Sequence, residues 1–144
     1  TSGLASGSTE DIPGGTNYTI RYNETRFNTT GSGLFMVTSG TRLTAPREGF
    51  YWLGFTHLWD NAFRDGAAAS FIQINGATVV DQDATPFTSG ANGVQHKCTT
   101  LHYMNSGNYM EVLVNTTVSG IDILHSDNYS AEAFMTLHCV SGGC

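Results

Sequence analysis

The run from residue 50 to residue 59, Phe-Tyr-Trp-Leu-Gly-Phe-Thr-His-Leu-Trp, limits the possible folds more than any other part of the sequence. Its residues are aromatic, branched or small, which is typical of a β-strand. Pro46 and Gly49 lie just before it, and both interrupt regular structure, because proline lacks an N–H group and glycine accepts turn dihedrals. The sequence therefore predicts a break in the chain followed by a long strand.

Both faces of this predicted strand are apolar. Successive side chains of a strand point to opposite sides. One side would carry Tyr51, Leu53, Phe55, His57 and Trp59, and the other Phe50, Trp52, Gly54, Thr56 and Leu58. An antiparallel sheet in an isolated sandwich usually leaves one face in water. Two interpretations remain open: a loop of the same chain covers the second face, or that face packs on other subunits.

The rest of the chain indicates a single all-β domain. Its 144 residues suit one domain, and glycine and small polar residues are plentiful while only 12% of residues are charged. Further strands are expected over residues 17–26, 34–37, 41–44, 67–74, 77–81, 94–104, 109–116, 121–124 and 131–140. Asn75-Gly76 is a strong hairpin signal, and residues 83–92, around Pro86, are expected to form a loop. The pattern predicts an antiparallel β-sandwich or barrel.

Charge and motif content argue against several classes of function. The formal charge is −6 and the chain has a single lysine, so no basic stripe for nucleic acid exists. No apolar run approaches the roughly 20 residues that span a bilayer. Neither a G-x-S-x-G motif nor a glycine-rich phosphate loop occurs. We therefore expect a protein that is not an enzyme, with no catalytic residues, no cofactor, and no nucleic-acid or membrane partner.

The histidines and neighbouring aspartates do not form a recognised metal motif. None of the five histidines, which are His57, His96, His102, His125 and His138, has a standard ligand spacing, so no metal site is predicted. Asp81 and Asp83 flank Gln82 beside a predicted loop and could hold calcium through oxygen ligands. The simpler alternative for these aspartates is a solvated hairpin end.

The cysteines and the glycosylation sequons indicate in which cellular compartment the protein is made. The three cysteines, Cys98, Cys139 and Cys144, are odd in number and form no C-x-x-C pair, which favours reduced thiols and synthesis in a reducing cytosol. Asn-x-Ser/Thr sequons occur at Asn17, Asn23, Asn28, Asn115 and Asn128. They would be glycan sites in a secreted eukaryotic protein, and we expect them to be unmodified in a protein made in bacteria.

The first fifteen residues differ in composition from the rest. They are rich in glycine and serine and end in Ile12-Pro13-Gly14-Gly15. This composition predicts a flexible N-terminal arm over residues 1–15, followed by the folded domain over residues 16–144. Leu4, Ile12 and Pro13 are its candidate contacts to a partner. A disordered tail without a role is the alternative.

Four motifs in order resemble the C1q and tumour necrosis factor-like jelly rolls. Residues 43–53 resemble the segment "F-T-x-P-x-x-G-x-Y-x-F" that opens a central strand of that family, and residues 74–76 resemble its "K-N-G" turn. Residues 103–112 resemble "L-x-x-G-D-x-V-x-V", and residues 129–134 resemble "S-x-F-S-G-F". The chain departs from the pattern at Asn108, in place of the usual Asp, and at Ala133, in place of the usual Gly.

The resemblance implies an antiparallel jelly-roll β-sandwich that forms a homotrimer, with one sheet of each subunit facing the three-fold axis. The interface would then contain Phe50, Trp52, Leu58, Tyr103 and Phe134. The same jelly roll occurs in bacteriophage capsid decoration proteins, head fibres and receptor-binding tips. No collagen-like repeat precedes the domain in this sequence, which favours the phage proteins over the secreted animal ones.

We therefore expect a virion structural protein that decorates or cements a capsid. Its arm would bind the major capsid protein or another virion protein. The alternative is a receptor- or carbohydrate-binding module, either a phage receptor-binding tip or a secreted C1q-like domain. Its partner would be a host surface glycan or receptor.

Overall fold

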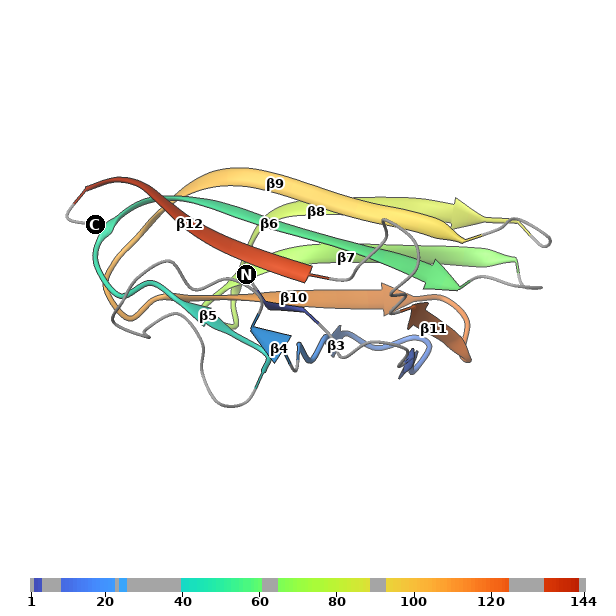
Figure 1. The fold of residues 1–144 in the computed structure, drawn as a ribbon. Coiled ribbons are helices and arrows are strands. Elements are labelled where there is room, and N and C mark those ends of the chain that lie inside the picture. Colours follow the sequence, from blue (N-terminus) through green and yellow to red (C-terminus); the bar gives the residue numbers. More distant parts are fainter. Residues whose placement is uncertain are drawn as a thin grey trace.

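The computed structural model of the chain describes residues 2–3, 9–22, 24–25, 40–60, 65–88, 93–124 and 134–142. Every regular element among these residues is a β-strand, and the strands form two antiparallel sheets (Figure 1). Within the described ranges, no helix is long and apolar enough to cross a membrane. The predicted all-β sandwich is confirmed.

The first sheet is organised around strand β6, the predicted aromatic strand. Strand β9 pairs with β6 along one edge, while β12 and then β11 pair along the other. Short strands extend the sheet outward: β2 pairs with β11, β1 pairs with β12, and β4 pairs with β1. The bounds are β1 Ser2–Gly3, β2 Thr9–Ile12, β4 Glu24–Thr25, β6 Gly49–Asp60, β9 Val94–Met104, β11 Ile121–Leu124 and β12 Phe134–Gly142.

The second sheet contains the hairpin that the sequence predicted. Strands β7 and β8 are joined at Asn75 and Gly76, whose φ angles are 52° and 68°. These positive values are those of the tight hairpin turn that the Asn-Gly pair favours. Strand β10 pairs with β7, and β3 and β5 pair with β10. The bounds are β3 Tyr18–Thr19, β5 Leu43–Thr44, β7 Gly66–Ile74, β8 Thr78–Phe87 and β10 Tyr109–Thr116.

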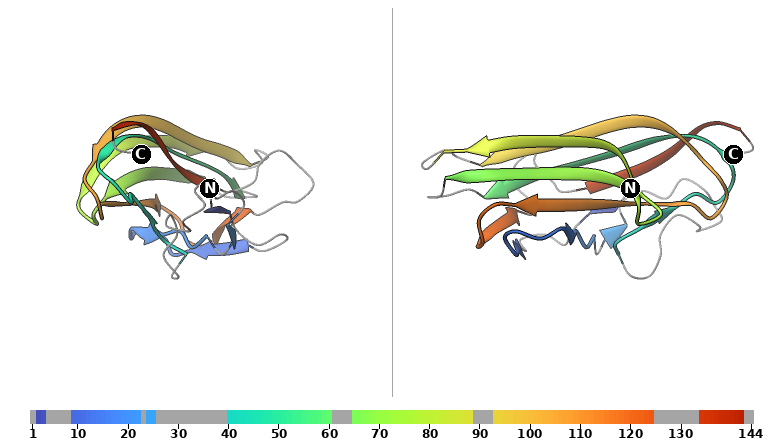
Figure 2. Two further views of the ribbon diagram at one scale, coloured as in Figure 1. Left: turned by 60° about the vertical axis from the view of Figure 1, so that its left-hand side comes forward. Right: turned by 180° about the vertical axis from the view of Figure 1, so that it is seen from behind.

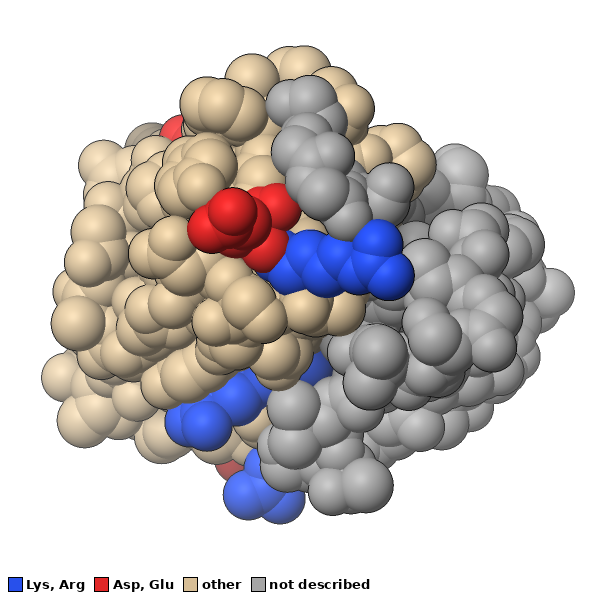
Figure 3. Space-filling model, turned by 90° about the vertical axis from the view of Figure 1, so that its left-hand side faces the viewer, with Lys and Arg blue, Asp and Glu red and all other residues tan. Residues whose placement is uncertain are grey.

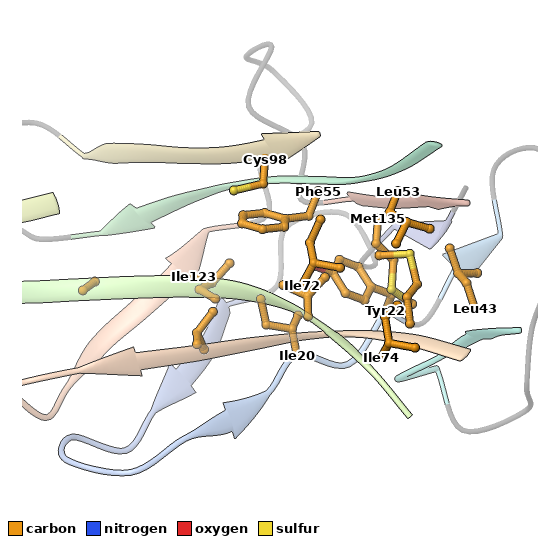
Figure 4. Packing of buried hydrophobic residues seen from close by; sticks show 14 of the residues in the cluster. Ile20, Tyr22, Leu43, Leu53, Phe55, Ile72, Ile74, Cys98, Ile123 and Met135 are labelled. Carbon is orange, nitrogen blue, oxygen red and sulfur yellow. The ribbon is translucent and has the colours of Figure 1, made fainter. Parts of the chain in front are cut away.

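The two sheets stack face to face, and the core lies between them (Figures 1 and 2). Figure 4 shows side chains from both sheets meeting there, among them Leu53 and Phe55 from β6 and Ile72 from β7. Tyr51, Leu53, Phe55, His57 and Trp59 all point inward, as the alternation in the sequence predicted. Strands β8 and β9 lie side by side, where the neighbouring edges of the two sheets meet.

Strand β8 is longer than the sequence indicated. It continues through Pro86, which stands opposite Ala67, so the predicted loop over residues 83–92 is wrong for residues 83–87. Proline cannot donate to a sheet, but it is tolerated on an edge strand. Among the described strands β8 pairs only with β7, so the missing N–H breaks no ladder.

Part of the segment expected to be a flexible arm is built into the first sheet. Residues 9–12 form β2 and pair with the free edge of β11. Ile12 has no exposed surface and packs in the core, whereas Pro13 is exposed. The segment is ordered here because pairing with β11 satisfies the backbone groups of that strand edge and also buries the apolar side chain of Ile12. Ile12 therefore serves the core and is not an available anchor; Leu4 lies outside the described residues.

The cysteines are not all reduced. Cys98 is a buried free thiol, but Cys139 is disulfide-bonded, with its partner outside the described residues. The expectation of reduced thiols is wrong for Cys139. An odd number of cysteines excludes complete pairing but not one bond, so the count alone could not decide the matter.

Replacement of Ile12 by alanine tests whether β2 belongs to the folded domain. We expect a loss of about 2–5 kcal/mol in the free energy of unfolding, because the change leaves a cavity at a fully buried position. Denaturant unfolding measures the loss. Thr16→Ala, at an exposed position, is the matched control and should cost little. Equal stability of the two variants would show that β2 contributes nothing to the core.

Candidate interaction surface

A group of large apolar side chains stands in solvent on the outer face of the first sheet. Phe50 and Trp52 of β6 are each 45% exposed, and Leu101 and Tyr103 of β9 are each 47% exposed. The register places Phe50 opposite Tyr103 and Trp52 opposite Leu101. We call these four residues the apolar patch.

The apolar patch faces solvent because successive side chains of β6 point alternately into the core and away from it. Tyr51 and Leu53 lie between and beside the patch residues in sequence and are completely buried. Since successive side chains alternate, Phe50 and Trp52 cannot enter the same core. The rings of Phe50 and Tyr103 meet edge to face, with centroids 5.3 Å apart. This contact is a favourable aromatic geometry, and it holds the two exposed rings together.

The patch has defined limits. Beyond Trp52 comes Gly54, where an added Cβ would lie 3.1 Å from Thr136 Oγ1 and 3.2 Å from the Cys98 carbonyl oxygen. Next along the same face is Thr56, whose hydroxyl accepts a hydrogen bond from the Gln95 amide. The four patch residues therefore lie at the end of the sheet where β6 begins. Figure 3 shows the end of the molecule that lies on the left in Figure 1, where acidic and basic side chains stand next to one another among uncharged residues.

The exposed area of the patch is large in energetic terms. Full burial of one such side chain stabilises a protein by about 1.5–3 kcal/mol, and each patch residue has nearly half of its surface left to bury. Covering all four would contribute on the order of 3–5 kcal/mol for each copy of the chain. Contiguous apolar surfaces of this kind mark interaction sites in soluble proteins.

The structure brings together three of the five residues predicted for the interface. Phe50, Trp52 and Tyr103 belong to the patch. Leu58 is on the same face but half-buried, at the other end of β6 and close to Gly93. The backbone of Phe134 pairs with that of Thr56, and its side chain lies outside what the structure describes.

Two exposed apolar residues in this region were missed from the sequence. Leu101 has the same strand parity as Tyr103, so the alternation of β9 could have identified it. Val140 is 50% exposed and lies between Cys139 and Ser141, where the register of β12 against β6 shifts. No sequence signal marks that irregularity, so the exposure of Val140 could not have been predicted.

A second feature, inside the sandwich, is a buried polar cluster. His57 Nε2 lies 2.9 Å from Ser70 Oγ, and Ser70 Oγ lies 2.7 Å from His96 Nδ1. The indole N–H of Trp59 donates to the same His96 Nδ1, at 3.1 Å. His57 and Trp59 come from β6, His96 from β9 and Ser70 from β7 of the other sheet.

The chemistry of this cluster is limited by its burial. A serine hydroxyl beside an imidazole is the arrangement of an activated nucleophile. Here Ser70, His57 and His96 all have no exposed surface, so no substrate reaches the hydroxyl. Burial also lowers the pKa of His96, because desolvation disfavours the imidazolium, and the nearby Asp83 carboxylate opposes this only in part. The cluster therefore acts as a structural hydrogen-bond network.

The aspartates considered for calcium make contacts with the backbone. Asp83 Oδ2 accepts a hydrogen bond from the backbone N–H of Lys97, at 3.0 Å, and Asp81 Oδ1 accepts one from the N–H of Gln82, at 2.9 Å. Asp83 thus links β8 to β9. In the part of the chain that the structure describes, no group of three metal-ligating side chains gathers.

Two sequon asparagines contact each other, Asn115 in β10 and Asn17 just before β3. Asn115 Nδ2 donates to Asn17 Oδ1, at 2.9 Å. Asn17 is exposed and Asn115 half-buried. Asn23, Asn28 and Asn128 lie outside the described residues, and the unmodified state of all five stays a prediction.

Comparisons with known proteins identify the fold. No family model matches the chain, and no curated protein matches its sequence. Among solved structures, that of Eiger TNF from S. frugiperda is similar, with a TM-score of 0.65 and 12% sequence identity. The similarity covers 97% of this chain and 89% of that one. The chain therefore has a TNF-like jelly-roll fold, as its motifs implied, and identity this low shows the fold alone.

The environment of Cys98 predicts an unreactive thiol. Burial, followed by the charges of Asp81 and Asp83, raises the pKa of Cys98 to about 12. At pH 8 only about one thiol in ten thousand would be ionised, and the thiolate is the nucleophile. We expect iodoacetamide at pH 8 to leave Cys98 unmodified in the folded protein and to modify it in denaturant, as measured by peptide mass mapping. Rapid labelling of the folded protein would contradict this environment.

Proposed function

We propose that this chain is a homotrimeric, non-enzymatic jelly-roll module whose subunits associate through the apolar patch. The single observation that carries the proposal is the exposure of Phe50, Trp52, Leu101 and Tyr103 on one sheet face. In water this surface forfeits several kcal/mol for each copy. A second copy of the same chain is always present to cover it, and closed symmetric association buries the patch on every subunit.

The geometry of the first sheet supports a face-to-face mode of association. The patch residues stand on paired strands whose backbones are fixed by a continuous ladder over residues 49–59 of β6 and 94–104 of β9. A rigid, preformed apolar surface binds without a large ordering cost. The motif resemblance to C1q and tumour necrosis factor-like jelly rolls supports three copies about an axis.

The finer part of the proposal is a role in a virion coat, as a decoration or cement protein bound to the major capsid protein. Its support is the resemblance to phage jelly rolls. A disulfide at Cys139 is compatible with this place, since disulfides persist at virion surfaces as well as in secreted proteins. Because Ile12 is part of the core, attachment to the shell would use other surfaces of the domain.

One observation favours a second candidate, a carbohydrate- or receptor-binding module. The exposed rings of Trp52 and Tyr103 form an aromatic surface, and amphipathic rings of this kind are enriched in binding sites. In this case the patch would bind a ligand and would remain accessible in the functional protein.

Replacing Trp52 with aspartate tests the role of the patch in assembly. Trp52 is 45% exposed in the single chain, so the variant should fold. A charge placed in a buried interface costs several kcal/mol, so we expect the wild-type chain to sediment as a trimer at micromolar concentration and the variant to sediment as a monomer. Val79→Asp, at an exposed apolar position on β8, is the matched control and should remain trimeric.

A wild-type chain that is monomeric at micromolar concentration would contradict the proposal directly. A Trp52→Asp variant that still forms trimers would move the interface away from the patch. Circular dichroism of both variants shows that the sheets are intact, so that loss of assembly is not confused with loss of fold.

The two finer roles separate in a pair of binding measurements on the wild-type chain. A coat protein should co-sediment with empty shells of the major capsid protein from the same genome, and Trp52→Asp should weaken this by removing the avidity of three copies. A binding module should instead be retained on an immobilised glycan array. If a monomeric chain binds the glycan array and the Trp52→Ala variant does not, the result would favour the binding module over the coat protein.

A further inference from the structure

The buried polar cluster links the two sheets through their interior. Ser70 belongs to β7 of the second sheet, whereas its partners His57 and His96 belong to β6 and β9 of the first. The Ser70 contacts and the Lys97–Asp83 bond are hydrogen bonds that cross from one sheet to the other. The cluster is thus a polar cross-link within an otherwise apolar core.

The donor and acceptor of each bond follow from the tryptophan. An indole nitrogen can only donate, so His96 Nδ1, 3.1 Å from Trp59 Nε1, must be an unprotonated acceptor. Ser70 must then donate its hydroxyl hydrogen to the same Nδ1. Its oxygen is left to accept from His57 Nε2. The chain of bonds therefore runs from His57 through Ser70 to His96, and it requires neutral His96 with its proton on Nε2.

The charged groups near His96 do not outweigh the burial that keeps this imidazole neutral. Besides His96, the titratable or charged side chains on the elements packed around the cluster are Tyr51, His57 and Asp60 on β6, Asp81 and Asp83 on β8, and Lys97, Cys98, His102 and Tyr103 on β9, while β7 carries none. Asp83 favours a charged His96, but desolvation outweighs it. The Cys98 thiol is neutral, and Lys97 is exposed. Two aromatic rings also lie close to His96, with centroid distances of 5.8 Å for Trp59 and 5.9 Å for His57.

We propose that His57, Ser70, His96 and Trp59 form an acid-sensitive lock between the two sheets. A proton on His96 Nδ1 turns the acceptor into a donor. It then faces the Trp59 N–H, which has no lone pair, and the Ser70 hydroxyl, which must reverse its hydrogen. The Trp59–His96 hydrogen bond is then lost. The Ser70 oxygen can accept from His96 only after its own hydrogen turns toward His57 Nε2, which must give up its proton. The inference is independent of the proposed assembly, because the cluster is fully buried within one chain.

The direction of the pH dependence follows from linkage. The pKa of His96 is lowered in the folded chain, while in the unfolded chain it has its ordinary value of about 6.5. Above this value both states are neutral at His96 and the stabilising contribution is complete. As the pH falls below about 6.5, the unfolded chain binds a proton that the folded chain refuses, so stability is lost until the lowered folded pKa is reached.

The test compares unfolding of wild type and His96→Asn from pH 8 to pH 5. Asn is chosen because its side-chain oxygen can accept in place of Nδ1 and does not titrate. Across the window below about pH 6.5, we expect the unfolding equilibrium constant of wild type to rise up to tenfold more per pH unit than that of the variant, the slope of one proton. His102→Asn, a half-buried histidine on the same strand, is the matched control and should keep the wild-type slope. Equal slopes for wild type and His96→Asn would overturn the lock.

A measurement on the wild-type protein keeps the proposal testable if His96→Asn does not fold. Nitrogen-15 chemical shifts of the imidazoles report which ring nitrogen carries the proton. We expect folded His96 to be protonated on Nε2 and bare on Nδ1 at pH 7.5, and to stay mostly neutral at pH 6.5. A proton on Nδ1 at pH 7.5, or a largely charged ring at pH 6.5, would overturn the proposal.

Discussion

The rest of the structure depends on strand β6, which is hydrogen-bonded to neighbouring strands on both of its edges. This strand pairs with β9 over residues 49–59 on one edge, and with β12 and β11 on the other. A strand held on both edges cannot rotate, so the period of two alone decides which side chains enter the core. Tyr51, Leu53 and Trp59 enter it, and Phe50 and Trp52 are placed in water. The apolar patch is thus a direct consequence of how firmly its strand is fixed.

Much of the fold could be predicted because its signals are local. The hairpin could be predicted from two residues alone, because Asn75 and Gly76 accept positive φ angles at little cost. The long strand followed from its own composition. The extent of β8 could not be predicted, because Pro86 is tolerated only at a sheet edge, and edge position depends on which distant strands pair. The docking of residues 9–12 depends in the same way on a free edge of β11.

The candidate surface was partly accessible from alternation, and the interior cluster was not. Phe50, Trp52 and Tyr103 follow from strand parity, and the same rule extends to Leu101. Ser70 and His96 are 26 residues apart and meet only because two sheets stack with a particular offset. No spacing in the sequence encodes that meeting. The histidines therefore looked like isolated strand residues until the packing of the sheets brought them together.

The contact between Asp83 and the backbone of Lys97 has a consequence for how copies of this chain can meet. Among the described strands β9 has only β6 as a ladder partner, so its other edge would be a template for an incoming strand. The Asp83 carboxylate occupies one N–H of that edge and adds a negative charge there. Edge-to-edge growth, which leads to open-ended fibrils, is disfavoured on this side. The proposed association through the apolar patch does not use this edge, and it is complete once the patch of every subunit is covered.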